Sequence, residues 1–188
     1  LELRREFGVA AVTALVRIEG RPFGVIANSS QHLGGAIDSD ASDKIARFLG
    51  LCDAFGLPIL SLCDTPGFMV GPSAEATGLV RHASRLFVAA ASLRVPFFTV
   101  VLRRGYGLGA QAMAAGHFHA PVFTISWPSG EVSTTGFAGG GLVVARGRFN
   151  DTQLQTLAVE HGAREETYKG KRLLLIDKLG THDAEHIS

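Results

Sequence analysis

The sequence predicts an α/β fold made of repeated strand–turn–helix units. Apolar strands that begin near Pro58 and Pro96 each run into a loop containing glycine and then into a helical pattern. Strands that alternate with helices in this way form parallel sheets with helices packed on them. The second strand leads into glycines at alternate positions, Gly105, Gly107 and Gly109, and then into a run of small residues.

Composition places the 188-residue chain among globular proteins. It has 46% hydrophobic and 19% charged residues, and it is long enough for one domain with a substantial core. A formal net charge of +1 gives no electrostatic reason to expect nucleic acid or an anionic membrane as partner. No apolar run approaches the ~18 residues of a membrane span.

The cysteines and the first residue lead to expectations about the cellular compartment and about the length of the whole protein. Cys52 and Cys63 fit neither a disulfide framework nor a zinc spacing, so we expect two reduced thiols in a cytoplasmic protein. The chain starts at Leu1 rather than Met, in a charged stretch. We therefore expect it to be a piece of a longer protein.

The first part of the chain is predicted to form a hairpin, a helix and a strand. Val12–Glu19 and Pro22–Asn28 are apolar runs separated by a short turn, which is a hairpin pattern. Apolar residues then recur at helical spacing and predict a helix from about Ser42 to Phe55. Leu57–Cys63 is the predicted strand that follows.

The next part repeats the pattern. An apolar stripe between Ala76 and Ala90 predicts a second amphipathic helix. Phe97–Leu102 predicts a strand that ends at two arginines. We expect Leu108 and Gly109 to begin the next helix, for which the small residues Ala110–Ala115 allow tight packing. Val122–Ser126 predicts one more strand.

From Gly136 the character of the sequence changes. A glycine-rich stretch precedes a short helix predicted over Thr152–His161, and Arg164–Tyr168 and Lys171–Ile176 predict a hairpin. We therefore expect one domain over residues 1–146 and an atypical α/β tail of uncertain origin over residues 147–188.

The glycine turn after Phe97–Leu102 is the predicted centre of the site. A strand, a glycine turn and a helix N-terminus leave backbone N–H groups free to bind an anion or a developing oxyanion. Gly105 to Ala110 also fits the dinucleotide fingerprint G-x-G-x-x-A. That fingerprint expects an acidic residue at the end of the next strand, where the sequence has Ser126-Trp127. A dinucleotide site is therefore disfavoured.

Few side chains suited to acid–base or nucleophilic chemistry accompany this turn. No G-x-S-x-G elbow is present, and His117 and His119 have no third ligand nearby in sequence, so we expect no metal. Asp64–Phe68 reads as a rigid proline–glycine turn beside the site. This pattern favours chemistry in which the substrates supply the reactive groups and the protein stabilises negative charge on oxygen.

Several separated blocks then resemble a known family. The blocks are GGAIDSDASDKIARFLGLCDAFGLPILSLCDTPGF, GLVRHASRLFVAAASLRVP, RRGYGLGAQAM and WPSGE. In this order they resemble the C-terminal domain of a biotin-dependent acyl-CoA carboxyltransferase, the carboxyltransferase β-type component of propionyl- and acetyl-CoA carboxylases. The resemblance covers about Val9 to Gly141 and implies a crotonase-like (ClpP/crotonase) fold.

The resemblance also implies a reaction and its partners. The chain would be the biotin-side half of the enzyme, which transfers a carboxyl group from carboxybiotin to an acyl-CoA through an oxyanion-stabilised enolate. Biotin would arrive on a separate biotin carboxyl carrier or biotin carboxylase component and would not be attached to this chain. An N-terminal carboxyltransferase domain would bind the acyl-CoA, and the enzyme would be a homo-oligomer.

The resemblance assigns roles to residues by position. The backbone N–H groups of Leu108 and Gly109 would be the catalytic pair that stabilises the oxyanion of biotin. The biotin- or acyl-CoA-binding residues would be Gly34, Gly35, Ala36, Thr65, Pro66, Gly67, Phe68, Tyr106, Gly107 and Gln111. Leu108 replaces a glycine that is frequent in the family and narrows the approach, and Gln111 replaces an aspartate linked to acyl-chain selectivity.

Two alternatives remain open from the sequence. A stand-alone crotonase-fold acyl-CoA hydratase or decarboxylase would need a carboxylate over the turn, and Glu131 is the candidate. A degenerate, non-catalytic assembly domain would explain the tail.

We also expect the isolated chain to self-associate, because the family's domain buries a large surface against partners. An uncovered apolar patch usually finds a partner. The candidate patch residues are Phe68, Met69, Val70, Phe137 and Leu142. The alternative is that the tail folds back over them.

Overall fold

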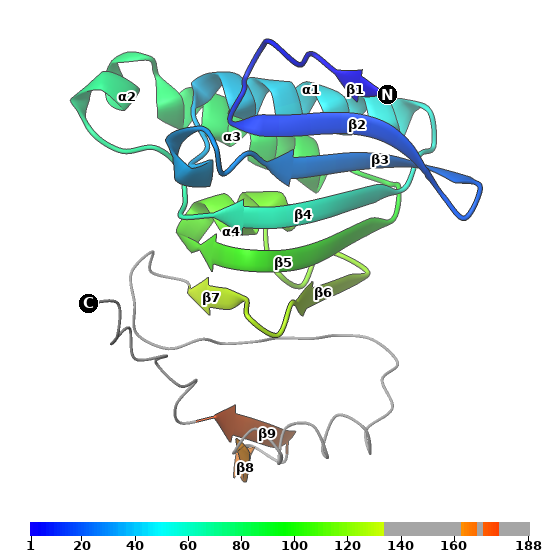
Figure 1. Cartoon of the computed structure of the whole chain (residues 1–188), viewed down its shortest axis with the longest axis vertical. Helices are drawn as coiled ribbons and strands as arrows, with labels where there is room; N and C mark the ends of the chain where they lie inside the picture. Colours follow the sequence, from blue (N-terminus) through cyan, green and yellow to red (C-terminus); the bar gives the residue numbers. More distant parts are fainter. Residues whose placement is uncertain (134–162, 169–170, 177–188) are drawn as a thin grey trace, which may run out of the picture. The chain divides into compact units, whose positions relative to one another are not determined.

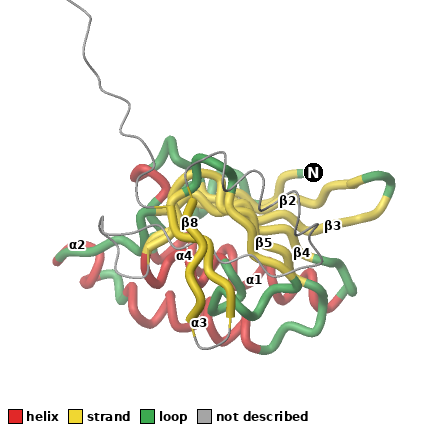
Figure 2. The backbone as a smooth tube through the Cα atoms, turned by 90° about the horizontal axis from the view of Figure 1, so that it is seen from below, coloured by secondary structure: helices red, strands yellow, loops and turns green. Residues whose placement is uncertain are grey.

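The computed structural model describes residues 1–133 in full and the backbone of two further strands, residues 163–168 and 171–176. The chain divides into two compact units, Leu1–Gly147 and Arg148–Ser188. In the first unit a seven-stranded sheet carries α1 (Ser39–Ala54) and α3 (Leu79–Ala91) side by side on one face (Figures 1 and 2). The α/β class predicted from the sequence is confirmed.

The sheet is mixed. Its strands are β1 (Glu2–Leu3), β2 (Ala11–Ile18), β3 (Arg21–Asn28), β4 (Ile59–Thr65), β5 (Phe97–Tyr106), β6 (Phe123–Ser126) and β7 (Glu131–Ser133). β1, β2 and β3 pair antiparallel, which confirms the predicted hairpin. β3, β4, β5 and β6 pair parallel in that order. β7 pairs parallel with the far end of β5.

The helices follow their predicted positions with two differences. They are η1 (Leu33–Gly35), α1 (Ser39–Ala54), α2 (Pro72–Ala76), α3 (Leu79–Ala91) and α4 (Gly107–Met113). α1 begins three residues earlier than predicted, because the Asp38 carboxylate accepts the Ala41 N–H at 2.8 Å and caps the helix there. The single helix predicted between Ala76 and Ala90 is broken, because Gly78 adopts a left-handed conformation with φ 73°.

β4 and β5 are the repeated strands that organise the chain. They lie in register, with Ile59 opposite Phe97, and each begins directly after a proline. β5 does not end at Arg103 and Arg104 as predicted. Its pairing with β7 carries it on to Tyr106. α4 then starts at Gly107, so Leu108 and Gly109 lie in its first turn, as predicted.

The core lies between the sheet and the helices. The largest fully buried apolar side chains come from both layers, and they are Ile26, Ile37, Ile45, Leu49, Ile59, Leu86, Val101 and Met113. Lys44 of α1 is buried with them, and its ammonium donates to the Ala11 carbonyl at 2.7 Å. Burial lowers the pKa of this lysine, which is the direction expected when a charged group is removed from water.

The second unit contains the predicted hairpin. β8 (Ala163–Tyr168) and β9 (Lys171–Ile176) pair antiparallel with Tyr168 opposite Lys171. The predicted helix Thr152–His161 and the glycine-rich stretch lie outside the described residues. Among the residues that are described, none of the helices has the length and apolar character to cross a membrane.

Candidate functional site

Three chain segments predicted to form the site come together at one end of the sheet. They are the segment around Gly34–Ala36, the loop after β4, and the end of β5 with the start of α4. The Ile37 N–H donates to the Gly67 carbonyl at 3.0 Å, and the Met69 N–H donates to the Ile37 carbonyl at 2.9 Å. These bonds join the first two segments.

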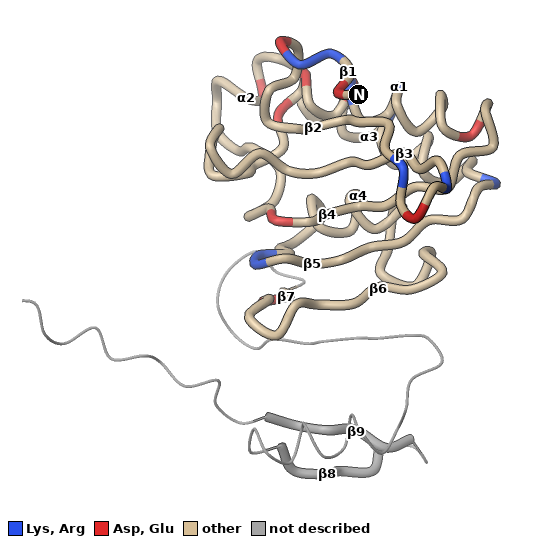
Figure 3. The backbone as a smooth tube through the Cα atoms, turned by 45° about the vertical axis from the view of Figure 1, so that its right-hand side comes forward, with Lys and Arg blue, Asp and Glu red and all other residues tan. Residues whose placement is uncertain are grey.

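Asp64 joins the third segment to the other two. Its carboxylate accepts the Arg103 guanidinium at 2.9 Å and the Arg104 backbone N–H at 3.2 Å. The Arg104 guanidinium lies 3.6 Å from the same carboxylate and donates to the Gly34 carbonyl at 2.6 Å. The acidic end of β4 therefore lies beside the basic end of β5 (Figure 3).

Asp64 is the shared partner of two arginines, and its hydrogen bond to Arg103 raises the pKa of that arginine. A second carboxylate, that of Glu131, lies opposite Arg104 in the β5–β7 ladder. The sequence left open whether these arginines are solvated; their shared partner is distant in sequence and only the fold reveals it.

Two glycines let the segments approach closely. A Cβ atom on Gly109 would lie 2.7 Å from the Gly67 backbone, and one on Gly35 would lie 2.4 Å from the Asp64 carbonyl oxygen. Such distances are too short for any side chain, so α4 and η1 sit against the Asp64–Phe68 loop only because both positions are glycine. These glycines serve backbone packing as well as access for a ligand.

The proposed oxyanion pair lies in the first turn of α4. Leu108 and Gly109 are the second and third residues of the helix, where N–H groups have no acceptor within an α-helix. The Tyr106 side chain, at the N-cap, makes no capping hydrogen bond. Leu108 is 62% exposed, and Gly109 is buried against Gly67. These two N–H groups therefore lie in the first turn of α4, directly after β5.

The loop after β4 is held rigid from within. The Thr65 hydroxyl donates to the Gly67 carbonyl and accepts the Gly67 N–H, both at 3.1 Å. Phe68 packs against the core, with its ring 6.3 Å from that of Phe87. Thr65 is fully buried, so its hydroxyl stabilises the turn from inside and is not exposed to solvent.

The predicted site residues differ in their access to solvent. Exposed or half-buried are Gly34, Pro66, Phe68, Tyr106, Gly107, Leu108 and Gln111. Buried are Gly35, Ala36, Thr65, Gly67 and Gly109. The first set is at least partly open to solvent, and the second set is enclosed by the surrounding chain.

Glu131 is paired with a neighbour that the sequence did not identify. The Tyr106 hydroxyl donates to the Glu131 carboxylate, and this hydrogen bond raises the pKa of Tyr106. Both residues belong to the β5–β7 ladder, where Glu131 lies opposite Arg104. No local sequence signal predicts this pairing, because β7 has only three residues.

The histidines and cysteines are the remaining candidates for a metal site or a nucleophile. His117 accepts the His119 N–H at 3.2 Å, and His82 lies 2.9 Å from the Asp43 carboxylate. Within the described part of the chain, no three His, Cys, Asp or Glu side chains are grouped to hold a metal. Burial raises the pKa of the Cys52 thiol to about 11 and that of Cys63 to about 12, so neither is an activated nucleophile.

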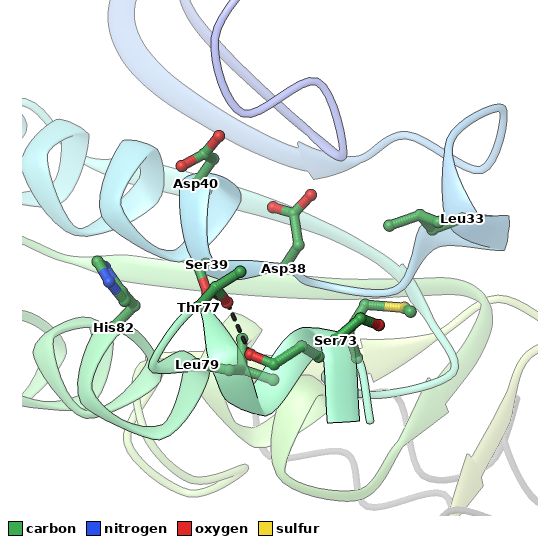
Figure 4. A pocket seen from close by; sticks show the side chains of 10 residues that line it. Leu33, Asp38, Ser39, Asp40, Ser73, Thr77, Leu79 and His82 are labelled. Carbon is green, nitrogen blue, oxygen red and sulfur yellow. Dashed lines mark hydrogen bonds between the residues drawn. The ribbon is translucent and has the colours of Figure 1, made fainter. Parts of the chain in front are cut away.

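A pocket of about 300 Å³, with a mostly apolar surface, lies between η1, α1 and the α2–α3 segment (Figure 4). It is lined by Leu33, Asp38, Ser39, Asp40, Met69, Ser73, Ala74, Thr77, Leu79 and His82. The Ser39 and Thr77 hydroxyls hydrogen-bond across it at 2.7 Å (Figure 4). None of the predicted site residues lines this pocket.

Comparison with known proteins identifies relatives over most of this unit. Residues 1–149 match the carboxyl transferase domain family. The chain is 39% identical to the propionyl-CoA carboxylase beta chain of Roseobacter denitrificans over 152 residues, 81% of this chain and 30% of the relative. It is 37% identical to the methylmalonyl-CoA carboxyltransferase 12S subunit of Propionibacterium freudenreichii subsp. shermanii over 146 residues, 78% of this chain and 28% of the relative.

Solved structures agree with these relatives. A single-chain, multi-domain long-chain acyl-CoA carboxylase aligns with a TM-score of 0.71 at 50% identity, over 85% of this chain and 16% of that one. The hexameric transcarboxylase 12S with methylmalonyl-CoA bound aligns with a TM-score of 0.67 at 36% identity, over 72% of this chain and 26% of that one. The predicted crotonase-like fold is confirmed. The chain spans less than a third of the curated relatives described above, and it belongs to the carboxyl transferase domain family.

Proposed function

We propose that this chain is the biotin-side half of an acyl-CoA carboxyltransferase, which moves a carboxyl group from carboxybiotin to an acyl-CoA. The observation that carries the proposal is the match of residues 1–149 to the carboxyl transferase domain family. The geometry supports it, because the segments that the resemblance assigned to the biotin site come together at one end of the sheet.

The donors on the chain fit the charge that the reaction develops. Bound as carboxybiotin, biotin supplies the carboxyl group and a ureido oxygen that becomes negative as this group leaves. The Leu108 and Gly109 N–H groups donate to that oxygen. Arg103 and Arg104 supply positive charge at the end of β5, where Asp64 is their shared partner. Fixed donors in such a position stabilise a developing oxyanion without reorganising.

The remaining predicted residues form the walls of this site. Gly34, Gly35 and Ala36 border it on the η1 side, and the loop with Thr65, Pro66, Gly67 and Phe68 borders it on the β4 side. Tyr106, Gly107 and Gln111 lie on the β5–α4 side. The exposed Leu108 side chain narrows the entrance and limits the access of water to the N–H groups.

The proposal requires partners, because the chain spans only 30% of the propionyl-CoA carboxylase beta chain described above. An N-terminal carboxyltransferase domain binds the acyl-CoA, and a carrier component delivers the biotin. The hexameric assembly of the 12S relative supports a homo-oligomer. We place the domain boundary near residue 146 and the protein in the cytoplasm, where its buried free thiols Cys52 and Cys63 stay reduced.

The alternative of a stand-alone hydratase or decarboxylase has less support. It needs a carboxylate that is free to act over the turn, and the Glu131 carboxylate is engaged by the Tyr106 hydroxyl. The relatives and structures described above are carboxylase or carboxyltransferase chains, which favours carboxyl transfer.

The experiment compares the isolated chain with the same chain joined to its acyl-CoA-binding half. Decarboxylation of malonyl-CoA or methylmalonyl-CoA is measured with and without free biotin. We expect biotin-dependent turnover in the two-part enzyme and none in the isolated chain. Absence of biotin-dependent turnover in the two-part enzyme would contradict the proposal. Turnover by the isolated chain would show that the acyl-CoA site lies within it.

A further inference from the structure

We infer that Glu131 is a positioning residue for the proposed carboxyl transfer, because through the Tyr106 hydroxyl it fixes the point at which β5 ends and α4 begins. This inference rests on the proposed function for its catalytic consequence. The structural part, a lock between β7 and the start of α4, stands on contacts within the chain.

The backbone at this point needs an external constraint. Tyr106 is extended, with φ −110° and ψ 140°, and Gly107 turns sharply with φ 58°. Leu108 and Gly109 follow directly, so their N–H directions depend on where this turn occurs. Tyr106 makes no side-chain cap to α4. Its ring instead reaches across to β7, where its hydroxyl is bound by Glu131.

The ladder places the two residues on the same face of the sheet. Arg104 pairs with Glu131 and Tyr106 pairs with Ser133, and alternate residues of a strand point to the same side. Glu131 therefore reaches diagonally along the ladder to Tyr106. Val132, the residue after Glu131, is buried in the core and holds β7 in place, which limits the movement of the Glu131 backbone.

Arg104 does not compete for this carboxylate. Its guanidinium donates to the Gly34 carbonyl at 2.6 Å and lies 3.6 Å from the Asp64 carboxylate. The Glu131 carboxylate therefore accepts its hydrogen bond from the Tyr106 hydroxyl. The two interactions tether the end of β5 from both sides, with Arg104 tied to η1 and Tyr106 tied to β7.

The position of Glu131 distinguishes this role from direct chemistry. A carboxylate that already accepts a hydrogen bond from the Tyr106 hydroxyl is poorly placed to remove a proton from a substrate. Its effect on the reaction is therefore indirect, through the orientation of the N–H groups that follow Tyr106. A hydrogen bond between a hydroxyl and a carboxylate is stronger than one between neutral groups, which suits a positioning contact.

The test uses the two-part enzyme with Glu131→Ala, Glu131→Gln, Tyr106→Phe and the Tyr106→Phe/Glu131→Ala double variant. We expect Glu131→Ala and Tyr106→Phe each to lower kcat about tenfold, with the KM for acyl-CoA unchanged. The double variant falls no further than either single one, because both remove the same bond. Glu131→Gln retains an acceptor oxygen and stays within about twofold of the parent.

Matched controls separate this effect from general damage. Glu75→Ala removes an exposed glutamate from α2, and Tyr168→Phe removes the only other tyrosine hydroxyl of the chain. Both are expected to leave kcat unchanged.

A second readout does not depend on activity. Peptide-resolved hydrogen exchange on the 188-residue chain follows the amides of residues 107–113. Exchange is expected to quicken in Glu131→Ala and Tyr106→Phe and to stay at the parent rate in Glu131→Gln and the controls. If the parent enzyme shows no carboxyl transfer, the proposed function fails while this measurement still tests the lock.

Two outcomes overturn the inference. In the first, Glu131→Ala keeps the parent exchange pattern and the parent kcat. In the second, Tyr106→Phe loses activity and Glu131→Ala does not, which would mean that the hydroxyl contacts the substrate directly.

Discussion

At the scale of single residues, the site depends on positions without a side chain. Gly109 lies against the Gly67 backbone and Gly35 against the Asp64 carbonyl, with no space for a Cβ atom at either. Gly50, in α1, has nothing within 4 Å of the same position. Replacement of glycine by alanine should therefore change the free energy of unfolding in opposite directions at Gly109 and Gly50.

We expect Gly109→Ala to lower the free energy of unfolding by about 1–3 kcal/mol, because the added methyl forces α4 away from the loop. Gly50→Ala should raise it by about 0.5–1 kcal/mol, because alanine restricts the unfolded chain and favours the helix. Urea denaturation of both variants measures the difference. Equal stabilities would mean that α4 does not pack on Gly67 as described.

At the scale of elements, Asp53 ties the end of α1 to the turn before β5. Its carboxylate accepts the Arg94 N–H at 2.8 Å and the Val95 N–H at 3.3 Å, and it pairs with the Arg94 guanidinium at 3.1 Å. The Arg94 N–H contributes most to lowering the pKa of Asp53. This contact links the last turn of α1 to the residues just before β5.

A depressed carboxylate pKa gives the stability a defined pH dependence. Asp53 binds a proton more readily in the unfolded chain, so its stabilising effect is present above the unfolded pKa near 4 and is lost as pH falls through the folded pKa. We expect Asp53→Asn to flatten this acid limb of the stability curve. Thermal unfolding between about pH 2 and pH 6 measures it. An unchanged limb in the variant would assign it to other carboxylates.

The elements also show which features the sequence could predict. The β2–β3 hairpin and the β4–β5 pair follow from apolar periodicity and from the prolines that start the strands, and these signals are local. The end of β5 was misplaced, because it depends on the pairing with β7 and on Asp64, which are distant in sequence. The Tyr106–Glu131 contact was missed for the same reason.

At the scale of the whole molecule, the predicted apolar patch is only partly as expected. Val70 is 83% exposed, whereas Phe68 packs on the core. Leu108 and Trp127 add exposed apolar surface, at 62% and 60%. Phe137 and Leu142 lie outside the described residues.

We still expect the isolated chain to self-associate, because its proposed partner domain is missing and apolar side chains are exposed around the site. Light scattering across a concentration series measures this, with Val70→Ser as a variant expected to reduce the association. A monodisperse monomer at high concentration would contradict the expectation and favour the tail, residues 147–188, as a cover.

The burial of both cysteines has a practical consequence for probes of this molecule. Cys52 lies under Gly24 and Cys63 lies inside β4, and both thiols stay protonated at neutral pH. Maleimides and other alkylating dyes react with accessible thiolates, so the folded chain resists them. A cysteine introduced at the exposed Val70 would then be the single fast-labelling position. A fluorophore there could report the docking of a partner without removal of the native cysteines.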